Sequence, residues 1–342
     1  MNLDALPRFP LVALPTPLQE LSRLSQRLRG PQLLVKRDDL TGLAFGGNKA
    51  RKLEFLIGDA LSAGADTVVT AGASQSNHCR QTAAAAARAG LGCHLVLGGS
   101  PPTVPTGNLL LDQLLGAHVH WAGPDRRGET MADLTERLCR EGKQVYPIPY
   151  GGSNPVGAAA YALAMGELCQ QLGKTGLHVD LIVFASSSGG TQAGLVVGAR
   201  AFGFAGQVLG ISIDKGEQGP EPYENELAAL ASATAARIGL DQEFSEEDFW
   251  VDYDYLGDGY GVLGEREREA ITMVARIEGL LLDPVYTGKA MGALIDMIRR
   301  GLIGQSKTVL FWHTGGGPAL FAYARELVEG NTGNEGEESE AT

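Results

Sequence analysis

Hydrophobic and polar positions follow two periods along the chain, and together they predict a repeated order of strand and helix. Short apolar runs typical of buried strands end in glycine or serine, and longer stretches with apolar residues three and four positions apart follow them. The predicted strands are 33–37, 67–71, 93–97, 119–121, 145–148, 181–185, 208–213 and 308–312. The predicted helices are 18–28, 49–61, 77–89, 108–115, 130–141, 155–172, 192–202, 222–238, 266–278 and 289–300, with a last helix that ends near 329. This alternation predicts an α/β fold with parallel sheets and right-handed crossover connections.

Composition and charge narrow the function classes. With 342 residues, 44% of them hydrophobic and 20% charged, the chain is long enough for two domains with ample core. A formal net charge of −12 disfavours binding to nucleic acid or to an anionic membrane. No apolar run approaches the length of a membrane span, about 18 residues, and the N-terminus lacks the apolar centre of a signal peptide. The four cysteines are scattered without C-x-x-C or metal-like spacing, so we expect free thiols in the cytoplasm and no metal.

A glycine turn ahead of a helix is the first candidate for chemistry. Gly46 and Gly47 allow a tight turn, and Asn48 is a favourable N-cap for the helix that follows. Lys49 then falls in the first turn, where the helix macrodipole disfavours a cation and lowers the pKa of the amine. A neutral amine can attack a carbonyl and form a Schiff base. From this segment alone, two other interpretations stay open: Lys49 is a solvated lysine, or Lys52 is the reactive amine.

Three glycine-rich loops join a strand end to a helix start, which is where ligands bind in open α/β sheets. The best anion cradle is Ser188-Gly189-Gly190-Thr191, which offers successive backbone N–H groups, two hydroxyls and a helix N-terminus. The loop has no lysine of the Walker A kind, and the first strand lacks a G-x-G-x-x-G motif. We therefore expect a small monophosphate, bound without metal. The alternative, which is stronger for the loop 313–317, is that small residues are needed there only for packing.

Short motifs spread along the chain form an ordered set. They are Lys36-Arg37-Asp38-Asp39, Gly46-Gly47-Asn48-Lys49-x-Arg51-Lys52, Gln75-Ser76-Asn77-His78-x-Arg80-Gln81, Ser188-Gly189-Gly190-Thr191, Leu282-Asp283-Pro284-Val285-Tyr286-Thr287-Gly288-Lys289 and His313-Thr314-Gly315-Gly316. From about Leu6 to Glu329, the chain resembles the pyridoxal-phosphate enzymes of the tryptophan-synthase-β type (fold type II). Within them it is similar to the branch that holds 1-aminocyclopropane-1-carboxylate deaminase and D-cysteine desulfhydrase.

The resemblance implies a pyridoxal 5′-phosphate cofactor and a role for each matching residue. Lys49 would hold the cofactor as a Schiff base, and Asn77 would hydrogen-bond the phenolic oxygen of its ring. The phosphate would lie on the loop from Ser188 to Thr191, including Gly189 and Gly190. We expect Trp312 and His313 to be structural residues, because a lone histidine at a strand end usually bonds to the backbone.

The resemblance also places the substrate, a small amino acid. Its carboxylate would meet Ser76 and the backbone of Ser74, Gln75 and Asn77 at a helix start, which by itself favours an anion. Tyr260 and Tyr286 match the two active-site tyrosines of the branch, although either tyrosine alone would more simply be a packing residue.

The implied fold is two α/β domains, each with an open, twisted, mostly parallel sheet. The larger, cofactor-binding domain would combine 1–50 with 163–330, and the smaller domain would be an insertion of 51–162. The cofactor would sit between them. We expect a homodimer, and a disordered acidic tail at 331–342.

Two positions bear on the reaction within the branch. The deaminases carry a glutamate aimed at the pyridine nitrogen where this chain has Thr287, and an aliphatic residue where it has Thr314. A neutral partner makes the ring a weaker electron sink, which suits the loss of a thiolate better than the opening of a cyclopropane ring. We therefore expect a lyase that converts D-cysteine to pyruvate, hydrogen sulfide and ammonia. The alternatives are an L-cysteate sulfo-lyase, a 1-aminocyclopropane-1-carboxylate deaminase and, more distantly, a non-catalytic pyridoxal-phosphate binder.

Overall fold

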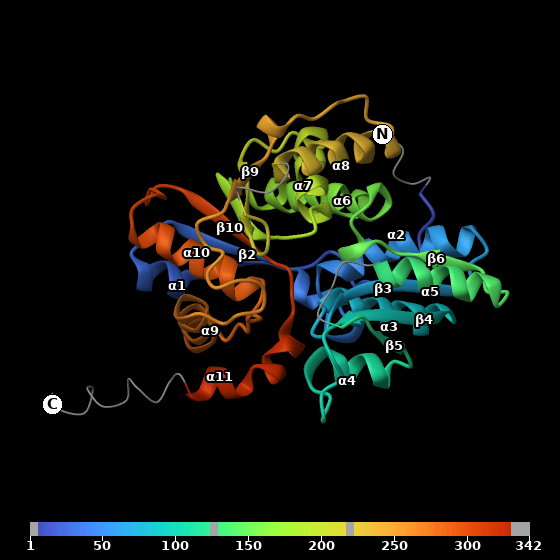
Figure 1. Ribbon diagram of the computed structural model, residues 1–342. Helices are drawn as coiled ribbons and strands as arrows, with labels where there is room; N and C mark the ends of the chain where they lie inside the picture. The colour runs from blue at the N-terminus through green and yellow to red at the C-terminus, as the bar shows by residue number, and fades with distance from the viewer. Residues whose placement is uncertain (1–5, 124–128, 217–221, 330–342) are drawn as a thin grey trace.

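The computed structural model describes residues 6–123, 129–216 and 222–329, which form two sheets covered by helices (Figure 1). The predicted acidic tail at 331–342 lies outside these described residues. The larger sheet has six strands in the order β1 (Leu18–Glu20), β2 (Gln32–Arg37), β10 (Thr308–His313), β7 (Leu181–Ser186), β8 (Gln207–Ser212) and β9 (Trp250–Asp252). Every pair in it is parallel except β1 with β2. The N-terminal and the C-terminal parts of the chain therefore both contribute strands to this sheet.

The smaller sheet has four strands, all parallel, in the order β5 (His118–Trp121), β4 (Gly92–Gly98), β3 (Thr67–Ala73) and β6 (Val145–Pro147). It is built from the stretch between β2 and β7, so the predicted insertion of a smaller α/β unit agrees with the strand order. The predicted boundaries at 50/51 and 162/163 fall inside the continuous helices α2 (Asn48–Ser62) and α6 (Pro155–Thr175). The exact division into domains stays a prediction.

Helices cover both faces of each sheet because the buried strands are apolar on both sides. On the larger sheet, one core packs against α6, α7 (Gly190–Phe202) and α8 (Tyr223–Arg237), and the other packs against α1 (Ser22–Leu28), α9 (Glu265–Glu278) and α10 (Thr287–Arg299). On the smaller sheet, α2, α3 (Asn77–Ala89) and α4 (Gly107–Leu114) share one core, and α5 (Glu129–Arg140) covers the other side. A short helix, α11 (Ala324–Glu329), ends the described chain. In Figure 1, the smaller sheet and its helices lie at the lower right.

The predicted order of elements is confirmed with two differences. The segment predicted as one helix over 18–28 is split, because Leu18–Glu20 pairs antiparallel with β2 and only Ser22–Leu28 is helical. The strand β9 was not predicted, since its three residues carry no clear apolar alternation and are held by pairing with β8. In both places tertiary pairing at a sheet edge decides the local structure.

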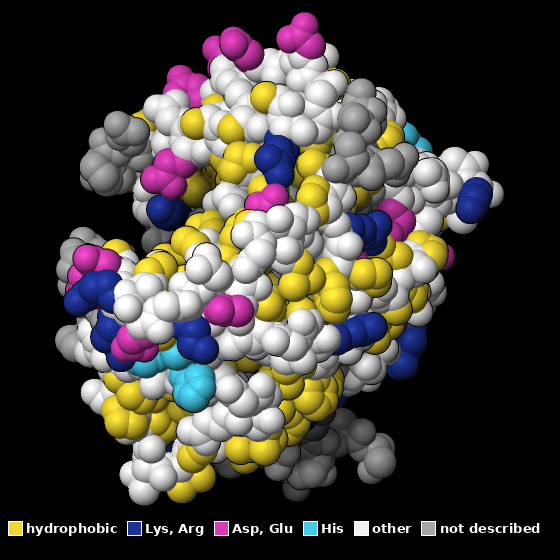
Figure 2. All heavy atoms as spheres, turned by 90° about the vertical axis from the view of Figure 1, so that its right-hand side faces the viewer, with side chains coloured by type: hydrophobic (Ala, Val, Ile, Leu, Met, Phe, Trp, Pro, Cys, Tyr) yellow, Lys and Arg dark blue, Asp and Glu magenta, His cyan; other side chains and the backbone are white. Residues whose placement is uncertain are grey.

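The smaller sheet carries a histidine cluster, and histidine side chains gather on the face shown in Figure 2. His94 on β4 stacks on His118 and His120 of β5, with ring centroids 4.9 and 5.3 Å apart. Burial, helped by the neighbouring imidazoles, lowers the pKa of His94 to about 4, and burial also lowers the pKa of His120. Both rings are therefore neutral at pH 7 and add no positive charge to this face.

Candidate active site

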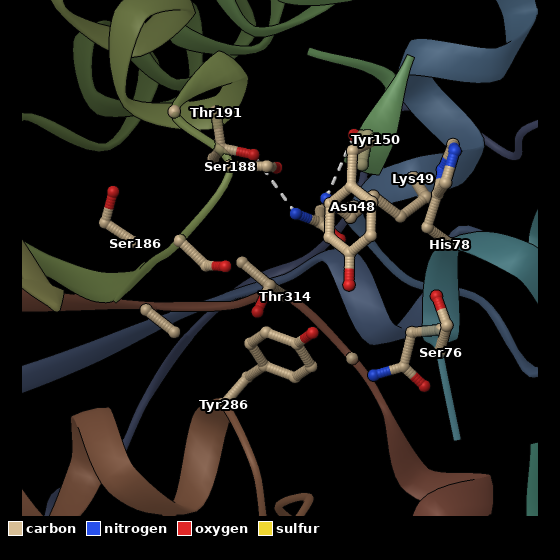
Figure 3. A pocket seen from close by; sticks show the side chains of 16 residues that line it. Asn48, Lys49, Ser76, His78, Tyr150, Ser186, Ser188, Thr191, Tyr286 and Thr314 are labelled. Carbon is tan, nitrogen blue, oxygen red and sulfur yellow. Dashed lines mark hydrogen bonds between the residues drawn. The ribbon is translucent and has the colours of Figure 1, made fainter. Parts of the chain in front are cut away.

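A cavity lies between the two sheets and takes its walls from both (Figure 3). Its lining residues are Asn48, Lys49, Ser76, Asn77, His78, Tyr150, Gly151, Ala185, Ser186, Ser187, Ser188, Gly189, Thr191, Tyr286, Thr314 and Gly315. Ser188 and Thr191 lie on one side of the space and Ser76 on the other, with Tyr150, Tyr286 and Thr314 between them (Figure 3).

The turn that carries Lys49 into the cavity requires glycine. Gly46 and Gly47 have φ of 66° and 127°, and a Cβ on Gly46 would lie 2.0 Å from the carbonyl oxygen of Asp39. The prediction that Asn48 caps the helix is wrong, because the N-cap is Gly47, which makes no side-chain capping bond. Asn48 is instead the first helical residue, and its Nδ2 donates to Thr191 Oγ1 at 3.1 Å. Asn48 thus ties the turn before Lys49 to the glycine loop of the larger sheet.

A buried ionic network fixes the same helix to the larger sheet. Asp38 is fully buried and accepts bonds from Arg51 Nη2 (2.8 Å), Tyr161 Oη (2.6 Å) and Trp312 Nε1 (2.8 Å). Burial raises the pKa of Asp38, but Arg51 and the other donors outweigh it, so the pKa is lowered and the carboxylate is charged. Arg51 lies two residues after Lys49, so this network sets where Lys49 stands. The contact of Trp312 agrees with its expected structural role.

Lys49 and Lys52 share one acceptor. Lys49 Nζ donates to Gly151 O at 3.1 Å, and Lys52 Nζ donates to the same oxygen at 3.2 Å. Burial lowers the pKa of Lys49 to about 8, and burial together with the nearby Lys49 lowers the pKa of Lys52 well below its usual value. Lys49 lines the cavity, whereas Lys52 does not. The geometry thus favours Lys49 over Lys52 as the amine that meets a carbonyl ligand.

The loop from Ser188 to Thr191 forms the other side of the cavity at the N-terminus of α7. Gly189 has φ of 81°, and α7 begins at Gly190. A Cβ on Gly190 would lie 2.7 Å from Ser153 Oγ and 2.9 Å from Lys52 Nζ, so a side chain there would displace these two polar groups. Ser188, Gly189 and Thr191 line the cavity, while Gly190 does not.

This loop fits the phosphate of the predicted cofactor. In the part of the chain that the structure describes, Lys52 Nζ donates to two neutral acceptors, Gly151 O and Ser153 Oγ (3.3 Å). An anion bound next to the N-terminus of α7 would supply a counter-charge and favour protonation of this buried amine.

The start of α3 forms the opposite wall. Ser76 is the N-cap, its Oγ accepts from Cys79 N at 3.2 Å, and both Ser76 and Asn77 line the cavity. Ser74 and Gln75, also predicted to meet the substrate carboxylate, are not among the lining residues. Gln75 turns away, because its Nε2 donates to Thr106 O at 3.0 Å. Ser76 and Asn77 are thus brought to the cavity, and the contact of the Ser74 and Gln75 backbone with the substrate carboxylate stays a prediction.

The two predicted tyrosines touch each other, but only one of them lines the cavity. Tyr286 is a lining residue, and its Oη lies 2.7 Å from Oη of Tyr260. Burial first, then Tyr260, raises the pKa of Tyr286 well above its usual value. The Tyr286 hydroxyl therefore stays protonated and can donate a hydrogen bond into the cavity.

The two predicted threonines occupy different places. Thr314 lines the cavity beyond the end of β10. Thr287 is fully buried, and its Oγ1 donates to Asp283 Oδ1 at 2.8 Å and accepts from Asp283 N at 2.7 Å. Of the two, Thr314 is the one that the structure brings to the cavity. His313 binds Leu281 O at 3.0 Å with Nε2, in agreement with its expected structural role.

Several lining residues were not predicted. Tyr150 and Gly151 follow β6. The glycine pair after this strand is the sequence feature that could have indicated these two lining residues. His78 lies in the first turn of α3, and its Nε2 is 2.9 Å from Thr70 Oγ1. Burial lowers the pKa of His78 well below its usual value, so this ring is neutral.

The residues that the structure describes are 6–123, 129–216 and 222–329. Within them no group of three or more His, Cys, Asp or Glu side chains could hold a metal ion, and no helix is long and apolar enough to cross a membrane. All four cysteines are free thiols, as predicted.

Comparison with known proteins gives the family. The family described as "Pyridoxal-phosphate dependent enzyme" matches residues 10–315. A Pyrococcus abyssi protein provisionally named a 1-aminocyclopropane-1-carboxylate deaminase is 44% identical over 331 residues, which cover 96% of this chain and 97% of that protein. A Klebsiella pneumoniae D-cysteine desulfhydrase is 42% identical over 332 residues, which cover 95% and 99%. A solved structure titled "Crystal Structure Analysis of the ACC deaminase homologue" matches with a TM-score of 0.87 and 39% identity, covering 96% of this chain and 97% of that one. This chain therefore belongs to the pyridoxal-phosphate-dependent enzymes, in the family of 1-aminocyclopropane-1-carboxylate deaminase and D-cysteine desulfhydrase.

Proposed function

We propose that this enzyme converts D-cysteine and water to pyruvate, hydrogen sulfide and ammonia by α,β-elimination. The observation that carries the proposal is the neutral wall of the cavity. Among the described residues that line it, none is acidic, and Thr314 supplies a hydroxyl. Thr314 is then the neutral partner for the ring nitrogen of the cofactor. The contact of Thr287 with that nitrogen stays a prediction, since its hydroxyl is bonded to Asp283.

The residues around the cavity would bind the cofactor at three points. Backbone N–H groups from Ser188 to Thr191, together with Lys52, would hold the phosphate, and Asn77 would donate to the phenolic oxygen. Lys49 would hold the cofactor covalently. When bound, pyridoxal phosphate withdraws electrons from the α-carbon of the attached amino acid, which makes its α-proton acidic.

The substrate would be held and deprotonated by this chain's own groups. The N-terminus of α3 with Ser76 would receive the substrate carboxylate. Lys49 Nζ, whose pKa is lowered to about 8 by burial, exchanges protons near neutral pH and would take the α-proton. The Tyr286 hydroxyl stays protonated and would donate a hydrogen bond to the leaving sulfur.

Loss of sulfur explains why a neutral wall suffices. The bonding electrons of the Cβ–S bond leave with the hydrosulfide, so the elimination needs little charge storage on the ring. Cyclopropane opening has no such leaving group and benefits from a carboxylate beside the ring nitrogen. This contrast favours the D-cysteine reaction, although the relatives carry both names.

The nearest alternative is another lyase of the same branch, one that acts on L-cysteate and releases sulfite. A sulfonate leaving group needs cationic or several neutral donors at the β end of the substrate. Among the described lining residues, Lys49 is the only lysine or arginine, and the cofactor engages it. The lining therefore favours a hydrosulfide over a sulfite leaving group.

One set of incubations separates these reactions. The holoenzyme is given D-cysteine, L-cysteine, L-cysteate or 1-aminocyclopropane-1-carboxylate, with Lys49→Ala as the inactive control. Pyruvate and sulfide in equal amounts from D-cysteine would support the proposal. Sulfite from L-cysteate, or 2-oxobutanoate and ammonia from the cyclopropane substrate, at a higher kcat/KM would contradict it. No product from any of the four would favour the non-catalytic binder.

Two further expectations concern the setting of the enzyme. We propose a homodimer and a cytoplasmic location. Apolar side chains such as Phe45 and Phe321 are 68% and 73% exposed, which suits a subunit interface. The thiol of Cys139 is exposed, which suits a reducing compartment. Sedimentation of the holoenzyme as a monomer would contradict the first expectation.

A further inference from the structure

A buried asparagine connects the α3 wall of the cavity to helix α4. Asn108, near the start of α4, is fully buried. Its Nδ2 donates to Asn77 Oδ1 and to the carbonyl oxygen of Gln75, both at 2.8 Å. Its Oδ1 accepts from Arg80 Nη1 at 3.0 Å. All the polar atoms of this amide are therefore engaged.

The chemistry of these groups fixes the direction of every bond. The Arg80 guanidinium can only donate, so Asn108 must turn its Oδ1 toward it. The Nδ2 of Asn108 then faces Asn77, which must accept this hydrogen bond with its own Oδ1. The remaining side of the Asn77 amide, Nδ2, is left as a donor for the cavity that Asn77 lines. This polarity follows from the donor-only cation and does not depend on telling nitrogen from oxygen in an amide.

Arg80 also reaches the turn before Lys49. Its Nη2 donates to Gly46 O at 2.8 Å, and the side chain is fully buried. Burial lowers the pKa of Arg80 to about 10, which leaves it charged at pH 7. One cation therefore supports both the glycine turn and, through Asn108, the amide of Asn77.

We propose that Arg80 and Asn108 are positioning residues that orient the Asn77 amide so that its Nδ2 donates a hydrogen bond to the phenolic oxygen of the cofactor. The inference rests on the Asn77 contact proposed above. A hydrogen bond to that oxygen disperses its negative charge, which otherwise holds the proton of the linkage between Lys49 and the cofactor. The hydrogen-bond relay from Arg80 through Asn108 to Asn77 therefore lowers the pKa of the linkage between Lys49 and the cofactor.

The test is the pH titration of the visible absorption band of the holoenzyme. Asn108→Asp keeps an acceptor for Arg80 but removes the donor to Asn77, so the Asn77 amide turns and presents Oδ1 to the cavity. We expect the pKa of the linkage to rise by about one unit, the scale of one hydrogen bond. Asn77→Ala should raise it by a similar amount. Asn108→Asp added to Asn77→Ala should cause no further rise in the pKa of the linkage, because no Asn77 amide is left for residue 108 to orient.

Each outcome discriminates. An unchanged pKa in Asn77→Ala would overturn the Asn77 contact itself. A shift in Asn77→Ala with none in Asn108→Asp would leave that contact standing and overturn the relay. A full further shift in the double variant would show that the new carboxylate acts through its charge, which also overturns the relay.

Two more variants control for charge and folding. Gln113→Glu makes the same amide-to-carboxylate change at an exposed position of α4, and it should leave the pKa of the linkage unchanged. Asn108→Ala removes the donor without adding charge and serves if Asn108→Asp does not fold. It should shift the pKa in the same direction, and an unchanged pKa would contradict the relay.

Discussion

Replacement of Lys52 by methionine should separate cofactor affinity from folding stability, because the two are expected to change in opposite directions. Lys52 is 1% exposed, and burial together with Lys49 keeps its pKa well below the usual value. Between the lowered pKa of the folded state and the usual lysine value, the unfolded chain therefore binds a proton that the folded apoprotein lacks, which destabilises the fold and does so less as pH rises. Methionine, of similar length, removes this penalty, so the free energy of unfolding of the apoprotein should rise.

Cofactor binding should weaken in the same variant. Lys52 Nζ lies beside the backbone of Gly190, and a bound phosphate would restore its charge. One hydrogen bond to a charged group contributes about 1.5–3 kcal/mol, which is about tenfold to 150-fold in the dissociation constant of pyridoxal phosphate. Absorbance titration of the apoprotein gives the affinity, and urea unfolding of the apoprotein gives the stability.

A matched control is Lys289→Met. Lys289 is also 1% exposed and also donates to backbone oxygens, Leu256 O at 2.6 Å and Gly259 O at 3.3 Å, but it does not line the cavity. Its loss should leave the affinity for pyridoxal phosphate within about twofold, less than the effect of one hydrogen bond. Parent-like cofactor affinity in Lys52→Met, or a less stable apoprotein, would refute the reasoning.

Three further results are expected. Thr191→Ala should weaken pyridoxal phosphate binding by about 1–2 kcal/mol, the contribution of one hydrogen bond. Gly190→Val should weaken binding more, because a Cβ there would crowd Lys52 Nζ at 2.9 Å. Equal dissociation constants for Gly190→Val and the parent would place the phosphate site elsewhere. Asp38→Asn should lower the free energy of unfolding by about 3–5 kcal/mol, since it breaks a buried ion pair with Arg51, and a loss under about 1 kcal/mol in urea unfolding would contradict this. The rate at which the apoprotein takes up pyridoxal phosphate should rise with pH around a midpoint near 8, because burial lowers the pKa of Lys49 and only its neutral amine attacks; a midpoint near the usual lysine value would be the contrary result.

The order of elements could be predicted from the sequence because the central strands of both sheets are buried on two faces and read as apolar runs. The edge strands of the larger sheet could not be predicted in this way. Leu18–Glu20 and Trp250–Asp252 are three-residue edge strands whose conformation depends on pairing with β2 and β8. Local pattern carries little information about such tertiary pairing.

The candidate site divides in the same way. Lys49 and the loop at Ser188 could be predicted, because a helix start after glycine is a local feature with its own chemistry. Residues placed by side-chain contacts could not be predicted locally. Asn48 looked like a helix cap but bonds Thr191, and Asn108 reaches the site only because α4 packs on α3. The two threonines, Thr287 and Thr314, differ in burial and partner in a way that no sequence pattern shows.

The central claim is that Lys49 holds the cofactor, and chemical reduction tests it most directly. Borohydride should fix the pyridoxyl group to the protein irreversibly, and peptide mass mapping should then locate it. The account predicts the label on Lys49 in the parent, with loss of both the label and the visible absorption band in Lys49→Ala. Recovery of the label on Lys52 or Lys36 in the parent, or a retained label in Lys49→Ala, would contradict it.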